Sequence, residues 1–87
     1  MAYALEYLER AQDDLDQLDP LVARRTEAKM RWFATQRDPF RYASRLTKPA
    51  IGDVRFRIGD YRVIAYADQR RKRIVVAAVG NRRDIYR

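Results

Sequence analysis

Apolar residues in the first third of the chain recur at helical spacing. Residues 2–7 alternate small or acidic residues with Tyr and Leu, which fits a short strand. An amphipathic helix is then predicted by a stripe at steps of three and four residues: Leu8, Ala11, Leu15 and Leu18. Asp19 supplies an N-cap and Pro20 the first position of a second, antiparallel helix that ends near Thr35. Its predicted buried residues are Val22, Thr26, Met30 and Phe33.

The carboxy-terminal part of the chain has the period of strands. Residues 54–58, Val-Arg-Phe-Arg-Ile, alternate strictly, and a Gly59-Asp60 turn follows. Residues 61–68 and 73–79 are apolar on both faces and predict two central strands. Between helices and strands, residues 36–53 carry turn signals without a sustained period, which predicts a long surface loop anchored by Phe40 and Leu46.

Together these patterns predict an α+β fold with the element order βααβββ. A small antiparallel sheet, made of the carboxy-terminal three-strand meander and the amino-terminal strand, carries two antiparallel helices on one face. The chain of 87 residues is 47% hydrophobic and 36% charged, which predicts one folded domain spanning residues 1–87.

Composition limits the chemistry that the chain can perform. With no cysteine and no histidine, the chain has neither thiolates nor the commonest metal ligand, and we expect no metal ion or other cofactor. No apolar run approaches the roughly 20 residues that cross a bilayer, and the amino terminus lacks a signal pattern. We therefore expect a cytoplasmic protein that has no membrane partner.

Positive charge is concentrated outside the first 20 residues. The net charge is +7, but residues 1–20 carry one arginine and six acidic residues, which leaves +12 on the remainder. The cations alternate along predicted strands and do not line one face of an amphipathic helix. This distribution favours nucleic acid over a membrane surface as the partner.

One face of the predicted meander gathers arginines. They come from its first strand, from the start of its second and from the residues after its third: Arg55, Arg57, Arg62, Arg82 and Arg83. Strands that pair in sequence order bring three tyrosines near them: Tyr61, Tyr66 and Tyr86. Like charges placed close together repel unless an anion lies between them. Because guanidinium groups bind phosphate and tyrosine rings stack on unpaired bases, the pattern predicts a site for single-stranded RNA.

These residue types suit metal-free RNA cleavage in part. The reaction needs a base for the 2′-hydroxyl, cations for the developing negative charge and an acid for the leaving 5′-oxygen. The arginines can stabilise charge, and Tyr86 is the evident proton-transfer group. Arginine, with a pKa above about 12, is a poor general base, so the residues leave the base unassigned.

Four segments, in order along the chain, resemble the RelE family of bacterial and archaeal toxins. They are Met1-Ala2-Tyr3 with Glu9-Arg10-Ala11, Val54-Arg55-Phe56-Arg57, Gly59-Asp60-Tyr61-Arg62-Val63, and Val79-Gly80-Asn81-Arg82-Arg83-Asp84-Ile85-Tyr86. The resemblance runs nearly end to end. It implies the toxin of a type II toxin-antitoxin system, a ribosome-dependent endoribonuclease that cuts mRNA in the A site. It also implies contacts with 16S and 23S rRNA and neutralisation by a RelB-like antitoxin.

The resemblance further implies roles for individual residues. Arg55 and Arg57 match two functional basic residues that are often lysines. Arg62 matches a strand arginine, Arg82 the arginine at the scissile phosphate, and Tyr86 a tyrosine that stacks on or protonates the substrate. Further RNA contacts are expected from Arg83, Lys48, Arg45 and Tyr61. The chain departs from the family in two ways. Arginine replaces both lysines, which leaves the base to the substrate or rRNA. The sequence has one residue after Tyr86, so we expect it to lack the carboxy-terminal helix that some relatives have.

Plainer roles stay open for the same residues. Arg55 and Arg57 also fit an ordinary solvated strand face, and Arg62 fits a brace for its turn. Tyr86 also fits a core position beside the preceding Ile, and Arg83 fits an ion pair with the Asp that follows it. Two other functions remain: a ParE-like toxin that inhibits DNA gyrase on the same fold, and a non-catalytic nucleic-acid-binding module, for which a basic surface suffices.

Overall fold

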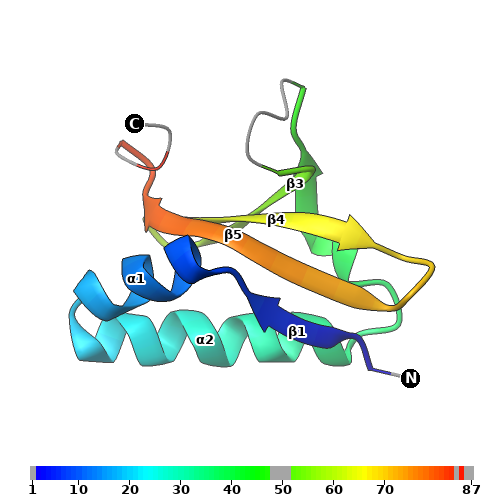
Figure 1. Ribbon diagram of the computed structural model, residues 1–87, viewed down its shortest axis with the longest axis horizontal. Coiled ribbons are helices and arrows are strands. Elements are labelled where there is room, and N and C mark those ends of the chain that lie inside the picture. Colours follow the sequence, from blue (N-terminus) through cyan, green and yellow to red (C-terminus); the bar gives the residue numbers. More distant parts are fainter. Residues whose placement is uncertain (1, 48–51, 84, 86–87) are drawn as a thin grey trace.

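Two helices cover one face of a five-stranded sheet in the computed structural model of the protein (Figure 1). The structure describes residues 2–47, 52–83 and 85. In chain order its elements are β1 (Ala4–Tyr7), α1 (Glu9–Gln17), α2 (Pro20–Thr35), the 3₁₀ turn η1 (Pro39–Tyr42), β2 (Ala43–Arg45), β3 (Val54–Ile58), β4 (Tyr61–Asp68) and β5 (Arg73–Asn81). Neither helix within these ranges is long and apolar enough to cross a membrane.

Both helices form where the apolar spacing predicts them. The Asp19 carboxylate caps α2 by accepting a hydrogen bond of 2.9 Å from the Leu21 N–H, and Pro20 begins the helix. α1 buries Ala11 and Leu15, and α2 buries Thr26, Met30, Phe33 and Ala34. The predicted burial therefore holds for α2 except at Val22, which is only partly buried.

The predicted α+β fold and carboxy-terminal meander are confirmed, with two differences in the sheet. The strand order is β1-β5-β4-β3-β2, and β3, β4 and β5 are antiparallel neighbours. β1 pairs with β5 in parallel, so the sheet is mixed and not antiparallel throughout. Alternating polarity reports which face a side chain occupies and carries no information on strand direction.

The second difference lies in the segment predicted as a long loop. Residues 36–53 include η1 and the edge strand β2, whose three residues pair with β3 and are too few to show a period. The Asp38 carboxylate caps η1 by accepting from the Phe40 N–H. Phe40 packs edge-on against Tyr3, with ring centroids 5.4 Å apart, and Leu46 packs against the opposite sheet face. Phe40 and Leu46 therefore both anchor this segment to the sheet, as the sequence predicts.

Two apolar clusters lie on opposite faces of the sheet. The main core joins the helices to the inner sheet face and includes Met30, Phe33, Phe56, Val63, Ile74 and Val76. A smaller cluster on the outer face consists of Ile64, Ala78 and Ile85, with Leu46 packed against it. Ile85 reaches this face because the chain turns back after β5, on the side of the sheet away from the helices (Figure 1). The same turn carries Arg82.

Candidate functional site

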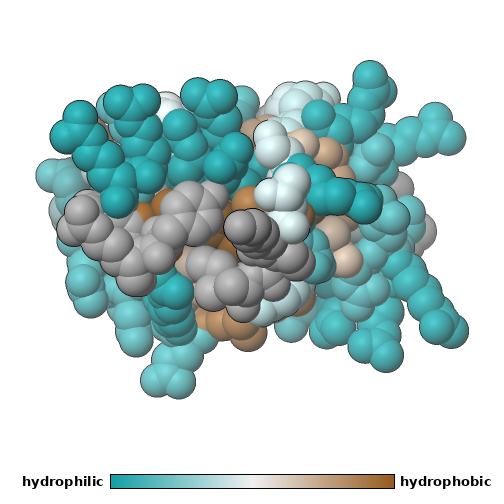
Figure 2. Space-filling model, turned by 90° about the horizontal axis from the view of Figure 1, so that it is seen from above, coloured by the Kyte–Doolittle hydropathy of each residue, from teal (hydrophilic) through white to brown (hydrophobic). Residues whose placement is uncertain are grey.

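Strand register places three arginines on the sheet face that the helices leave open. Arg57 lies directly opposite Arg62, and Arg55 lies opposite Ile64. Side chains alternate along a strand, so these arginines point to the outer face while the residues between them enter the main core. Figure 2 looks onto this face, where hydrophilic residues surround a small hydrophobic centre.

Arg62 is the most buried of these cations. It is 7% exposed, and its Nη1 donates hydrogen bonds of 3.0 Å to the carbonyl oxygens of Gly59 and Tyr61. These bonds hold the guanidinium against the β3–β4 turn. Because a buried charge has lost much of its water, Arg62 is poised to gain from an anion at its side.

The electrostatics of Arg62 show that four arginines act on one region. Burial lowers the pKa of the Arg62 guanidinium, and the positive charges of Arg57, Arg55 and Arg82 lower this pKa further. The charge of Asp60 acts in the opposite direction. We call Arg55, Arg57, Arg62 and Arg82 the arginine cluster. The three other members disfavour the charge of Arg62, so a bound phosphate would offset an existing repulsion as well as make new hydrogen bonds.

The turn after β5 brings Arg82 to this cluster. The Arg82 N–H donates to the carbonyl oxygen of Asp60 at 3.0 Å, which ties the turn to the β3–β4 hairpin. Within the turn, the N–H groups of Arg83 and Ile85 donate to the side-chain and backbone oxygens of Asn81, each at 3.0 Å. These bonds fix the backbone of Arg82 while its side chain stays exposed.

A glycine lies where the turn folds back onto the sheet. A Cβ on Gly80 would lie 3.2 Å from the Ile85 Cδ1, closer than most such contacts in proteins. Gly80 also lies opposite Arg62 in the register of β4 and β5. Its missing side chain therefore leaves room for Ile85 beside the most buried arginine.

The structure does not bring every predicted RNA-contacting residue to the arginine cluster. Arg83 shares the turn of Arg82 and is exposed. Tyr61 lies opposite Ile58, which packs against the main core, so it belongs to the inner face and not to the face of the arginines. Tyr66 shares the outer face but is four residues from Arg62, about 13 Å along an extended strand. Two further predicted site residues, Lys48 and Tyr86, lie outside the described residues.

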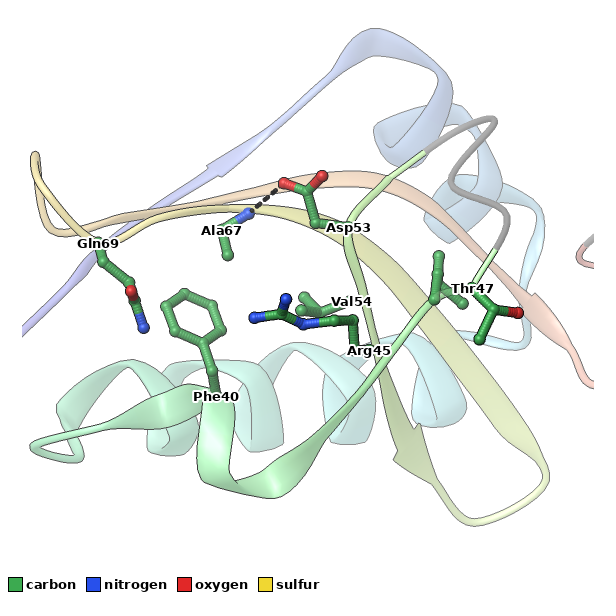
Figure 3. Close-up of a pocket in the computed structure, with 8 residues that line it drawn as sticks. Phe40, Arg45, Thr47, Asp53, Val54, Ala67 and Gln69 are labelled. Carbon is green, nitrogen blue, oxygen red and sulfur yellow. Dashed lines mark hydrogen bonds between the residues drawn. The ribbon is translucent and has the colours of Figure 1, made fainter.

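Arg45 lies in a separate pocket beyond the amino-terminal end of β3. This pocket, of about 470 Å³, is lined by Phe40, Arg45, Leu46, Thr47, Asp53, Val54, Ala67 and Gln69. In Figure 3 the Arg45 guanidinium extends toward the side of the pocket that holds Phe40, and the Asp53 carboxylate accepts a hydrogen bond of 3.1 Å from the Ala67 N–H. Among the described residues that line the pocket, Arg45 is the one cation and no member of the arginine cluster is present, so we place the candidate phosphate site on the cluster.

Comparison with known proteins identifies the class of fold. No protein-family model matches the chain, and no curated protein sequence matches it. Solved structures do match, and the fold is that of RelE toxins.

Three structures illustrate the likeness. A chain of the toxin-antitoxin complex RelBE2 from Mycobacterium tuberculosis is 23% identical, with a TM-score of 0.78 over 94% of this chain and 100% of that chain. A chain of the archaeal RelE-RelB complex from Pyrococcus horikoshii OT3 is 24% identical, with a TM-score of 0.73 over 94% and 97%. Free E. coli RelE carrying two arginine-to-alanine substitutions is 20% identical, with a TM-score of 0.72 over 93% and 84%. The likeness is one of fold, and function has to be argued from the residues of this chain.

Proposed function

We propose that the protein is the toxin of a type II toxin-antitoxin system and cleaves mRNA in the ribosomal A site. The observation that carries this proposal is the arginine cluster, in which Arg62 is buried and three further arginines act on it. The cluster stands on a fold shared with RelE toxins, and three of the similar structures are complexes of a toxin with its antitoxin. A RelB-like antitoxin is accordingly the proposed inhibitor.

The proposed reaction is an internal transfer at phosphorus. The 2′-oxygen of one nucleotide bonds to the adjacent phosphorus, the bond from phosphorus to the 5′-oxygen breaks, and a 2′,3′-cyclic phosphate remains. Negative charge grows on the phosphoryl oxygens, and preorganised cations stabilise that charge more than they stabilise the ground state. Arg62, held by two carbonyl oxygens, has the fixed position that such stabilisation requires.

The other members of the cluster have complementary roles in this proposal. Arg57 and Arg82 are exposed and contact the scissile phosphate directly, while the half-buried Arg55, the second residue of β3, adds positive charge. Arg83 contacts a neighbouring phosphate. Tyr86 is assigned to stacking or to protonation of the 5′-oxygen, and the proton acceptor is assigned to the substrate or ribosomal RNA, because arginines do not serve as bases near neutral pH.

Arg45, Lys48 and Tyr61 are proposed as secondary contacts. Arg45 lines the pocket, and the Tyr61 side chain lies on the inner sheet face, so neither side chain faces the arginine cluster. In the proposal they meet ribosomal RNA, whereas the cluster meets mRNA.

Induction of the protein in cells tests the proposal. We expect growth and translation to stop, and primer extension on mRNA from translating ribosomes to show cuts inside codons. Arg82→Ala should abolish both effects and still fold and bind the antitoxin, because the Arg82 side chain is exposed and its backbone makes the structural bond. Arg24→Ala, which removes one charge from an exposed position of α2, is the matched control and should stay toxic.

Two outcomes would refute the proposal. A folded Arg82→Ala variant with full toxicity would remove Arg82 from the site. Intact mRNA together with stalled replication would indicate gyrase inhibition instead.

A further inference from the structure

β1 pairs with only the first part of β5, so the second part of β5, which leads to the arginine cluster, has no strand partner on that side within the described residues. β1 pairs with β5 only as far as Tyr7 opposite Val76, and the Leu8 N–H then donates to the Val76 carbonyl oxygen. From there the chain continues as α1, which packs against β5 without pairing with it as a strand, and β5 continues for five residues to Asn81. The backbone N–H and C=O groups that point to this side of β5 therefore bond either to water or to groups outside the sheet.

Asp14 of α1 supplies one of these partners. Its Oδ2 accepts a hydrogen bond of 3.0 Å from the Val79 N–H, a contact between residues 65 positions apart. The Asp14 side chain is 24% exposed, so the bond is sheltered more than an ordinary surface contact. A helix side chain thus takes the place that a neighbouring strand would occupy.

Arg10 extends the same connection to the turn that carries Arg82. Its Nε lies 3.6 Å from the Asp14 Oδ2, and its Nη2 donates to the Ile85 carbonyl oxygen at 3.4 Å. Arg10 is also the only cation among residues 1–20. The Arg10 guanidinium therefore contacts both Asp14 on its own helix and the backbone at the end of the turn.

The two contacts lie on either side of Arg82. Val79 precedes the turn and Ile85 closes it, while the Arg82 N–H is held from the opposite direction by Asp60. An i,i+4 pair on a helix surface is usually a minor contributor to stability. This pair differs because each partner also holds backbone outside the helix.

We infer that Arg10 and Asp14 are positioning residues for Arg82. They touch no substrate and act by holding the turn after β5 at the edge of the arginine cluster. The expected effect on mRNA cleavage rests on the proposed function. The expected effect on the position of the turn rests on the geometry alone. A shift of about 1 Å in a catalytic group is enough to slow a reaction many-fold.

Three variants separate positioning from general stability. Arg10→Gln removes the charge and shortens the reach, and Asp14→Asn keeps the shape but weakens acceptance from both Val79 and Arg10. Arg10→Lys keeps the charge pair with Asp14 but lacks the forked guanidinium that also reaches Ile85. Arg31→Gln is the matched control, because Arg31 pairs with Glu27 at the same spacing on α2 and touches no part of the turn.

The first measurement is independent of any RNA chemistry. Trypsin cleaves after arginines in mobile segments, so the rate of cleavage after Arg82 and Arg83, followed by mass spectrometry, reports how firmly the turn is held. We expect about a fivefold faster cleavage in the two Arg10 variants and in Asp14→Asn, the effect of losing one hydrogen bond of ordinary strength. Arg31→Gln should match the wild type, and all variants should keep cooperative unfolding.

The second measurement is cleavage of ribosome-bound mRNA under steady-state conditions, which gives kcat and KM. We expect kcat to fall about five- to tenfold in Arg10→Gln and Arg10→Lys with KM unchanged, since substrate binding by the rest of the cluster is intact. An equal effect in Arg31→Gln, or a rise in KM alone, would overturn the positioning role. Unchanged trypsin cleavage in all three variants would overturn the inference itself. If the variants show faster trypsin cleavage but the wild-type protein cuts no mRNA, the positioning of the turn by Arg10 and Asp14 stands and the proposed function is rejected.

Discussion

Truncation of Ile85 tests whether the chain after β5 is part of the folded domain. Ile85 is 2% exposed and packs with Ile64 and Ala78 on the outer face of the sheet. Ile85→Ala removes three carbon atoms from that cluster and leaves the turn without its apolar contact. The same turn carries Arg82, so the substitution acts on the fold and on the candidate site together.

The magnitude follows from the buried carbons. At about 0.8 kcal/mol per buried methylene, the loss is about 2.4 kcal/mol. The value lies near the lower end of the roughly 2–5 kcal/mol typical of such truncations, and it suits a small cluster at the surface, where neighbours can collapse into the space. A domain of this size has a total of roughly 4–13 kcal/mol at about 0.05–0.15 kcal/mol per residue. We therefore expect the melting temperature to fall by about 10–20 °C.

Urea denaturation followed by circular dichroism and by Trp32 fluorescence gives the free energy of unfolding. Leu21→Ala is the matched control, because it removes an aliphatic side chain of the same size that is 57% exposed. We expect the control to lose less than about 0.5 kcal/mol. The slope of the free energy against urea should be unchanged in both variants if both keep the same fold.

Equal stability of Ile85→Ala and Leu21→Ala would refute the reasoning. It would mean that residue 85 contributes no apolar contact to the folded state in solution. The candidate site would then lack its support on the outer sheet face, and the placement of Arg82 beside Arg62 would have to be abandoned.

Three further predictions concern other parts of the molecule. Gly52→Ala should destabilise the fold by about 1–3 kcal/mol, measured by denaturation, because the new Cβ would lie 2.6 Å from the Ile64 Cγ2 and 2.9 Å from the Ala65 carbonyl oxygen. Burial raises the pKa of Tyr7 from 10.0 to about 12, so the contribution of Tyr7 to stability should be constant below pH 10 and fall between pH 10 and about 12. The unfolded chain ionises there before the folded one. Tyr7→Phe should lack that component, which is on the order of 1 kcal/mol after allowance for partial exposure. Affinity for short single-stranded RNA should fall with salt at a logarithmic slope of about −3 for four phosphate contacts, and Arg57→Gln should make it shallower by about 0.7; a slope near zero would exclude the phosphate site.

Much of the fold could be predicted because its signals are local. The cap at Asp19 and the strict alternation of residues 54–58 each depend on a few neighbouring residues, and both elements form where those signals indicate. Strand order and direction depend on packing between distant segments. The parallel pairing of β1 with β5 therefore has no local signature.

The candidate site divides in the same way. Alternation alone places Arg55 and Arg57 on one face, and the hairpin brings Arg62 opposite Arg57. Arg10 and Asp14 had a visible signal, an opposite charge pair at helical spacing, but their targets lie 75 and 65 residues away in the sequence. Tyr61 was expected beside the arginines. Because it is adjacent to Arg62 in the same strand, its side chain points to the inner face instead.

The position of β5 in the sheet has a consequence for how the protein folds. β5 follows all other strands in the sequence, yet it lies between β4 and β1, and β1 has no other strand neighbour. The pairing of Glu6 with Val75 closes most of the chain into one loop, a non-local contact of the kind that slows folding. Until β5 joins the sheet, Asp14 of α1 cannot bond to Val79, and the Arg82 N–H cannot bond to Asp60. Folding and assembly of the arginine cluster are therefore expected to be a single cooperative event, and a folding intermediate without β5 would carry Arg55, Arg57 and Arg62 but no complete phosphate site.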